Sequence, residues 1–193
     1  MDIIQLDQQV TLWINNLDTP RLYPLWMAFS DNRIWFLAYG LVMGWIIWKL
    51  GWKKGILVSL SLILCVVLTD QLSGVVKANF ERLRPCYNTW MLDHGLLLPY
   101  GQIGHLYGFF SSHAANVWGF AAASALGLSW NGKPQTFRAY GWGVFIWAAL
   151  VSLSRIMLGA HFLGDILVGT VFGLVIGVAV AGVVRLIVVK AKL

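Results

Sequence analysis

Five stretches of the chain are almost entirely hydrophobic, and polar or charged residues separate them. Each stretch is close to the roughly 20 residues that an α-helix needs to cross about 30 Å of hydrocarbon, although the fourth is short unless neighbouring residues join it. The pattern therefore predicts an all-α fold, an integral membrane helical bundle with about five transmembrane helices. The stretches cover residues 34–50, 55–76, 106–128, 140–153 and 162–189.

Residues 1–20 show a different pattern. Hydrophobic residues recur at helix-like intervals between Ile3 and Leu17, with polar residues between them. This spacing favours a helix that lies in the membrane interface, or one that packs on the bundle and raises its helix count to six. The segment has neither a basic start nor a long apolar core, so we do not expect a cleavable signal peptide.

Composition agrees with a membrane protein. Of the 193 residues, 59% are hydrophobic and 11% are charged, against roughly 45–50% and about 25% in soluble domains. The net charge of +6 could suggest nucleic acid, but the basic residues lie mostly at the ends of hydrophobic stretches, where membrane topology accounts for them. Without a linker, low-complexity tract or repeat, residues 1–193 are expected to form one domain that binds no nucleic acid. Nothing in the pattern specifies an oligomeric state.

The charged residues that flank the stretches predict the orientation of the bundle. Three groups of basic residues would lie on one side with no acidic residue among them, so the positive-inside rule places that side and the C-terminus in the cytoplasm. The N-terminal segment, the loop of residues 77–105 and the turn at residues 155–161 would then be extracytoplasmic. The three groups are Lys49, Lys53 and Lys54; Lys133 and Arg138; and Arg185, Lys190 and Lys192.

Three clusters of chemically active residues fall on the predicted extracytoplasmic side. The first begins at Lys77 and ends at Arg84-Pro85. If the residues between them are helical, the spacing places Lys77 and Arg84 two turns apart on one face, so both cations point the same way. Taken by itself, this cluster could instead be a set of basic side chains at a helix end that extend from the hydrocarbon to the membrane surface.

The second cluster, Ser111-Ser112-His113, lies early in the third hydrophobic stretch. A helix that begins there would present unpaired N–H groups and the positive end of its dipole, which favour an anion such as phosphate. A helix-capping role would explain Ser111. It would not explain His113, which is costly in or near hydrocarbon without a partner or a water-filled cavity.

The third cluster runs from Ser154-Arg155 to His161 and Asp165, at the start of the last hydrophobic stretch. His161 and Asp165 are four residues apart. On a helix, the carboxylate can therefore accept a hydrogen bond from one ring nitrogen and leave the other nucleophilic. A purely structural His-Asp pair is the alternative.

Together the clusters predict a site for a multiply charged anion. Lys77, Arg84 and Arg155 provide cations, and hydroxyl and backbone donors add charge-assisted hydrogen bonds, which are strong with phosphate. The two histidines would supply a nucleophile and a proton donor. A metal site is disfavoured, since the cations would repel a divalent ion and the spacing of three or four zinc ligands is absent. We expect neither a metal nor another cofactor.

The clusters resemble the motifs of the type-2 phosphatidic acid phosphatase superfamily, membrane lipid phosphatases whose active-site motifs also occur in vanadium haloperoxidases. Lys77 through Arg84-Pro85 matches the first motif, in which six residues separate a lysine from Arg-Pro. Ser154-Arg155, His161 and Asp165 match the third motif without a gap. The motifs span residues 77–165, whereas residues 1–76 match the family only in general character.

The second motif departs from the family pattern. The family usually has Pro-Ser-Gly-His, and Phe110-Ser111-Ser112-His113 stands in its place. The serine and the histidine are kept. Ser112 in place of glycine leaves its backbone N–H available to phosphate but would narrow the pocket, so the departure bears on substrate selection.

The resemblance implies a mechanism. His161 would attack phosphorus to give a phosphohistidine intermediate, while Asp165 holds the imidazole in the correct tautomer. His113 would protonate the leaving oxygen and then take a proton from the water that hydrolyses the intermediate. The phosphoryl oxygens would be bound by Lys77, Arg84, Ser111, Ser112 and Arg155.

The resemblance also implies a lipid substrate, taken from the bilayer of a bacterial inner membrane at a site that faces the periplasm or the cell exterior. Lipid A phosphate and undecaprenyl pyrophosphate are the first candidates, followed by phosphatidylglycerophosphate and phosphatidic acid. A vanadate-dependent haloperoxidase would need the same anion pocket, but known haloperoxidases are soluble. A non-catalytic membrane protein that binds lipid phosphates is the remaining alternative.

Overall fold

The structure, a computed structural model, describes residues 2–102, 104–129 and 134–192. Within these ranges the regular elements are helices, joined by loops, and an isolated β-bridge links Leu83 and Tyr107. The all-α prediction is therefore confirmed. The elements are α1 (Ile3–Asn15), α2 (Tyr23–Ser30), α3 (Asn32–Leu50), α4 (Trp52–Phe80), the 3₁₀ turn η1 (Pro85–Tyr87), α5 (Thr89–Asp93), α6 (Ser112–Ser129), α7 (Pro134–Met157) and α8 (Leu163–Lys190).

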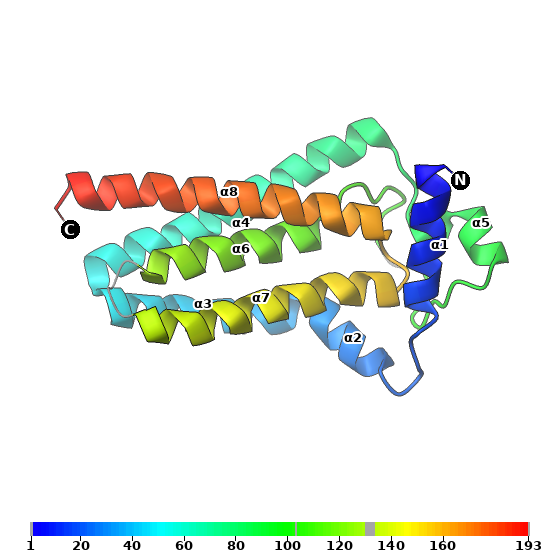
Figure 1. Cartoon of the computed structure of the whole chain (residues 1–193), viewed down its shortest axis with the longest axis horizontal. Helices are drawn as coiled ribbons and strands as arrows, with labels where there is room; N and C mark the ends of the chain where they lie inside the picture. Colours follow the sequence, from blue (N-terminus) through cyan, green and yellow to red (C-terminus); the bar gives the residue numbers. More distant parts are fainter. Residues whose placement is uncertain (1, 103, 130–133, 193) are drawn as a thin grey trace.

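The long helices run along the long axis of the molecule, with α6 lying among α3, α4, α7 and α8 (Figure 1). This helix packs on α4, α7 and α8. Its buried side chains are mostly small, including Ala114, Ala115, Ala121 and Ala122. Small residues let neighbouring backbones approach closely, which is the usual basis of helix packing in membranes.

The contact between α6 and α8 is especially close. Gly169, Gly173 and Gly177 recur every four residues along one face of α8. A Cβ atom at Gly173 would lie 2.3 Å from the carbonyl oxygen of Ala115, so no larger residue fits there without moving one helix. This small-residue stripe holds the N-terminal ends of α6 and α8 side by side.

Four helices are long and apolar enough to cross a membrane among the residues that the structure describes: α3, α4, the Arg138–Met157 part of α7, and α8. Large side chains on their outer faces are exposed, as expected for contact with lipid; Leu37 is 73% and Leu186 is 62% exposed. The predicted fourth stretch is a full-length helix because α7 extends at both ends. The predicted third stretch corresponds to α6, which begins only at Ser112 because residues 106–111 form a loop.

The two ends of the bundle differ in charge. The α3–α4 turn, the start of α7 and the C-terminal end of α8 share one end, whereas α1, α5 and the loops that lead into α6 and α8 share the other (Figure 1). The basic groups at residues 49–54 and 185–192 and Arg138 are thus at the first end, as predicted. Lys133 lies outside the described residues.

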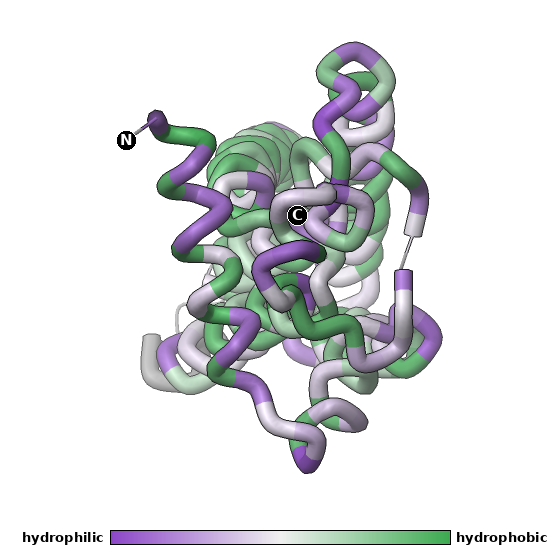
Figure 2. The backbone as a smooth tube through the Cα atoms, turned by 90° about the vertical axis from the view of Figure 1, so that its right-hand side faces the viewer, coloured by the Kyte–Doolittle hydropathy of each residue, from purple (hydrophilic) through white to green (hydrophobic). Residues whose placement is uncertain are grey.

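Helix α1 lies across the second end of the bundle (Figure 1). The buried amide of Asn15 donates to the carbonyl oxygens of Ile156 and Met157 at 3.1 Å each, at the end of α7. Hydrophilic and hydrophobic turns alternate along α1 (Figure 2), and Ile3 and Trp13 are exposed. In the structure α1 contacts the bundle through polar side chains, and apolar side chains such as those of Ile3 and Trp13 are directed outward.

Candidate active site

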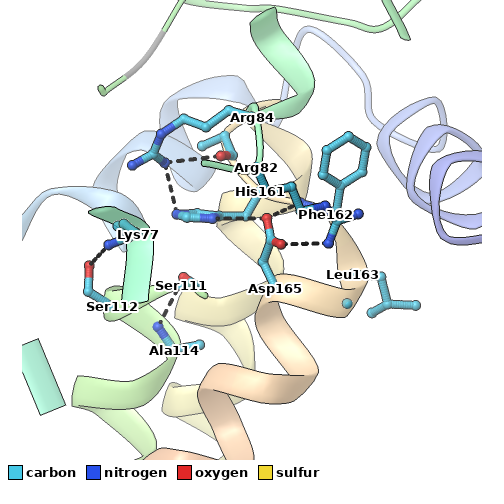
Figure 3. A network of polar contacts seen from close by, with 12 residues as sticks. Lys77, Arg82, Arg84, Ser111, Ser112, Ala114, His161, Phe162, Leu163 and Asp165 are labelled. Carbon is cyan, nitrogen blue, oxygen red and sulfur yellow. Dashed lines mark hydrogen bonds and ion pairs between the residues drawn. The ribbon is translucent and has the colours of Figure 1, made fainter. Parts of the chain in front are cut away.

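The predicted site residues lie at the end of the bundle that carries α1, around the N-terminal ends of α6 and α8. Figure 3 shows Lys77, Arg84, Ser111, Ser112, His161 and Asp165 among them. The last turns of α4 and α7 contribute Lys77 and Arg155, respectively. Residues 82–86 run beside residues 106–108, because Arg84 N–H donates to the Leu106 carbonyl at 3.0 Å and Gly108 N–H donates to the Arg82 carbonyl at 2.8 Å. The site is therefore assembled from segments far apart in sequence.

Lys77 and Arg84 come together by a route other than the predicted one. Helix α4 ends at Phe80, and Glu81 adopts a left-handed conformation with φ 46°, so the two residues do not share a helical face. The chain instead turns back and brings the Arg84 guanidinium over the site. Lys77 donates to the Ser112 hydroxyl at 3.1 Å and lies close enough to Arg84 for their charges to interact. The predicted helical spacing is wrong, but the predicted proximity holds.

His161 and Asp165 also differ from the predicted arrangement on one helix. His161 precedes α8, and Asp165 belongs to its first turn. One Asp165 oxygen accepts the Phe162 backbone N–H at 3.0 Å and lies 3.4 Å from His161 Nδ1. The pair therefore meets through the cap of a helix N-terminus. Both side chains are buried, with His161 1% exposed.

The contacts of His161 define its tautomer. Arg84 NH1 lies 2.9 Å from Nε2 and also donates to the Ala160 carbonyl at 3.1 Å. Because a guanidinium only donates hydrogen bonds, Nε2 is the unprotonated nitrogen, and the ring proton is on Nδ1, facing Asp165. Burial, together with the charges of Arg84 and Arg155, lowers the pKa of His161 well below its ordinary value. His161 is therefore neutral at pH 7, with its lone pair directed into the cationic site.

Arg155 and His113 complete the cluster. Arg155 donates to the Ser30 hydroxyl, and its Nε is buried without a hydrogen-bond partner in the described part of the chain. His113 lies in the first turn of α6, where the charges of Arg155 and Lys77 act on it. A buried donor without a partner beside two histidines is suited to an anionic ligand, since leaving such a donor unpaired is costly.

Ser111 and Ser112 lie at the N-terminus of α6. The buried Ser111 hydroxyl accepts the Ala114 backbone N–H at 3.3 Å, which is a helix-capping bond, and Ser111 N–H donates to the Asp165 carbonyl at 3.1 Å. Ser111 thus ties α6 to α8 and keeps its hydroxyl proton free to donate. The Ser112 hydroxyl is the partner of Lys77. The structure brings all eight predicted site residues to one end of the bundle.

Two charged residues at the site were not predicted. Arg82 donates to Asp165 at 2.8 Å and to Asp7 at 2.6 Å. Arg82 lies between the matched positions of the first motif, and Asp7 lies in a segment without a motif, so spacing alone gave no reason to select either. The available signal was charge, because a carboxylate at the start of a hydrophobic stretch, such as Asp165, needs a cation.

The described residues contain no group of three or more histidine, cysteine or acidic side chains that could hold a metal ion. Asp165 is the carboxylate in direct contact with His161, and Arg82 already neutralises it. The surplus of positive charge from Lys77, Arg84 and Arg155 is therefore directed at an anion.

Comparisons with known proteins agree with this geometry. A model of the PAP2 superfamily matches residues 58–188. A lipid A 4'-phosphatase of Porphyromonas gingivalis is 28% identical over 178 residues, which cover 91% of this chain and 71% of that protein. A lipid A 4'-phosphatase of Bacteroides thetaiotaomicron is 26% identical over 171 residues, which cover 87% and 72%.

Two crystal structures share the fold. The transmembrane PAP2-type phosphatidylglycerolphosphate phosphatase of Bacillus subtilis superposes with a TM-score of 0.74 and 20% identity, over 94% of this chain and 86% of that chain. LpxE of Aquifex aeolicus superposes with a TM-score of 0.66 and 23% identity, over 89% and 92%. The predictions of family, membrane fold and phosphatase activity are confirmed: this chain belongs to the PAP2 superfamily and is an integral membrane phosphatase.

Proposed function

We propose that this protein hydrolyses a phosphate monoester of lipid A, through a phosphohistidine at His161 and without a metal. The observation that carries the proposal is that Arg84 donates to the unprotonated Nε2 of His161 and that the charges of Arg155 and Lys77 act on the same ring, while Arg82 compensates the charge of the adjacent Asp165. Preorganised donors of this kind stabilise the charge that develops on a transferring phosphoryl group. We propose lipid A as the substrate because two relatives are named as lipid A 4'-phosphatases.

In the first step, a phosphoryl group enters beside His161, and the Arg84 guanidinium transfers its hydrogen bond from Nε2 to a phosphoryl oxygen. The Nε2 lone pair forms a bond to phosphorus as the bond from phosphorus to the lipid oxygen breaks. His113, which takes up a proton as the anionic phosphoryl group enters among the cations, donates that proton to the lipid oxygen. Asp165 accepts the Nδ1 proton in a hydrogen bond and stabilises the positive charge that grows on the ring.

In the second step, water attacks the phosphohistidine. His113, now unprotonated, takes a proton from the water, and the bond between Nε2 and phosphorus breaks to release inorganic phosphate. Lys77, Arg155 and the Ser111 hydroxyl hold the phosphoryl oxygens through both steps. The unpartnered Nε of Arg155 provides a donor for which the described chain has no other use.

We also propose that the site faces the periplasm or the cell exterior from an inner membrane. The basic groups gather at the opposite end of the bundle, which the positive-inside rule assigns to the cytoplasm. At the active-site end, cavities of about 390 and 400 Å³ lie beside α1 and are lined mainly by apolar side chains, with Arg82 in both. A lipid headgroup can reach the cations from there while its chains stay in the bilayer.

The test is phosphate release by the purified protein in detergent, with chelator present, from lipid A, undecaprenyl pyrophosphate, phosphatidylglycerophosphate and phosphatidic acid. We expect release from lipid A with loss of one phosphate by mass spectrometry, and inhibition by vanadate, which mimics the phosphoryl transition state. Preference for another lipid would redirect the substrate assignment. A strict magnesium requirement would contradict the mechanism, and vanadate-dependent bromide oxidation without phosphate release would identify a haloperoxidase.

Gly108 gives a second test of the site geometry. A Cβ atom there would lie 2.9 Å from Arg84 Cγ, 3.4 Å from Asp165 Oδ2 and 3.5 Å from His161 Nδ1. Overpacking of this degree typically costs about 1–3 kcal/mol, so Gly108→Ala is expected to lower kcat roughly 10-fold or more by displacing Arg84. Gly74→Ala is the control, because its Cβ would meet nothing within 4 Å. Equal kcat in the two variants would show that Arg84 need not hold its position.

A further inference from the structure

Arg82 occupies the centre of an ion-pair chain that extends from the catalytic pair to α1. Its NH1 donates to Asp165 Oδ1 at 2.8 Å, and its NH2 donates to Asp7 Oδ2 at 2.6 Å. The guanidinium carbon also lies 4.3 Å from the centre of the Phe162 ring, within the range of a cation–π contact. The side chain is 26% exposed, whereas Asp165 is fully buried.

We propose that Arg82 is a positioning residue that fixes Asp165, and that α1 is a required part of this arrangement because Asp7 holds Arg82 from the other side. The proposal rests on the phosphatase function proposed above. It gives the N-terminal helix, and a residue that does not face the phosphoryl site, a role in positioning the His161–Asp165 pair.

The first step of the argument concerns Asp165. Its Oδ1 is bound by Arg82, and its Oδ2 by the Phe162 N–H, which leaves Oδ2 directed at His161 Nδ1. A carboxylate rotates freely between its two oxygens unless both are held. Arg82 therefore selects the orientation in which His161 keeps its proton on Nδ1, and it compensates a charge that would otherwise be buried alone.

The second step concerns the start of α8. Its N-cap residue, Phe162, has no side chain that can cap the first N–H groups, and α1 provides the acceptors instead. Asp7 Oδ1 accepts the Gly164 N–H at 2.8 Å, and the Thr11 hydroxyl oxygen accepts the Leu163 N–H at 2.9 Å. These are among the N–H groups that a helix leaves unpaired. Docking of α1 thus fixes the helix end that carries Asp165.

The third step is the fit of α1 against α8. A Cβ atom at Gly164 would lie 2.7 Å from Asp7 Oδ2, so the close approach of Asp7 to the α8 backbone depends on glycine at this position. One aspartate thereby binds both a backbone N–H of α8 and Arg82. Removing Asp7 would loosen both contacts at once.

The test compares Arg82→Met, Arg82→Lys and Asp7→Asn in the purified full-length protein, with thermal unfolding used to confirm folding. For Arg82→Met we expect kcat to fall about 10- to 100-fold, the effect of a charge-assisted hydrogen bond, with KM within about twofold. Loss of a cation raises the proton affinity of Asp165 and His161, so the acid limb of the kcat profile should move to higher pH. Arg82→Lys should restore part of kcat, since lysine keeps the charge but cannot bind both aspartates.

Asp7→Asn should lower kcat less than Arg82→Met, and the double variant should be no slower than Arg82→Met, because both act through one chain. The control is Arg185→Met, which removes an exposed arginine near the C-terminal end of α8, at the opposite end of the bundle. A wild type without phosphatase activity would overturn the proposed function and this inference with it. An active wild type beside an Arg82→Met variant with unchanged kcat and pH profile would overturn this inference alone. If Arg82→Met does not fold, a wild-type kcat in both Arg82→Lys and Asp7→Asn would overturn it.

Discussion

Replacing His161 by alanine is expected to lower kcat by about 10⁴-fold or more, the scale seen when a nucleophile is removed from a catalytic unit. Arg84 faces the lone pair of His161, which attacks phosphorus in the proposed mechanism, whereas His113 serves there as the proton donor. Lipid binding should survive, because Lys77, Arg84 and Arg155 remain. The measurements are phosphate release and retention of labelled phosphate on the denatured protein, which should be lost together.

His94→Ala is the matched control. His94 lies on the same side of the bundle, with its ring stacked on Trp90 at 4.1 Å and its Nδ1 2.7 Å from the Trp90 carbonyl. It should retain wild-type kcat. An active His161→Ala variant would show that another group attacks phosphorus or that the anion site serves binding alone.

Much of the fold could be predicted because the hydrophobic pattern reports directly on lipid exposure. Between Asp165 and Arg185, for example, the last stretch is almost entirely apolar, since the side turned to lipid and the side turned to the bundle are both dry. The pattern could not place α1. Its docking depends on Asn15, Thr11 and Asp7, which bind backbone groups that exist only after α7 and α8 have taken their positions.

Most of the site residues could also be predicted from the sequence, but the prediction was incomplete. Ionisable residues are costly beside hydrocarbon, so His113, His161 and Asp165 stood out without a structure. The path of the chain between Lys77 and Arg84 could not be predicted. The residue that ends α4 in a left-handed conformation is Glu81, and glutamate gives no turn-forming signal of the kind that glycine or asparagine gives. Arg82 was missed because its role follows from two tertiary contacts.

Asp165→Asn should lower kcat by about 10⁴-fold, the loss observed when the aspartate of a hydrolytic triad is replaced by asparagine. Three donors face the carboxylate: Arg82 NH1 at Oδ1, and Phe162 N–H and His161 Nδ1 at Oδ2. An amide offers one oxygen and one NH₂ group. If its oxygen faces Arg82, the NH₂ group faces the imidazole, and the ring must move its proton to Nε2, directly opposite Arg84 NH1 at 2.9 Å.

The opposite orientation of the amide preserves the tautomer but sets the NH₂ group against the Arg82 guanidinium, whose charge then has only Asp7 to balance it. Both orientations place a donor against a donor, so the loss should appear in kcat even when the variant is folded. Asp93→Asn, in the exposed α5, changes a carboxylate to an amide on the same side of the bundle and should leave kcat unchanged. A folded Asp165→Asn variant with kcat within about tenfold of wild type would mean that His161 attacks phosphorus without a carboxylate partner.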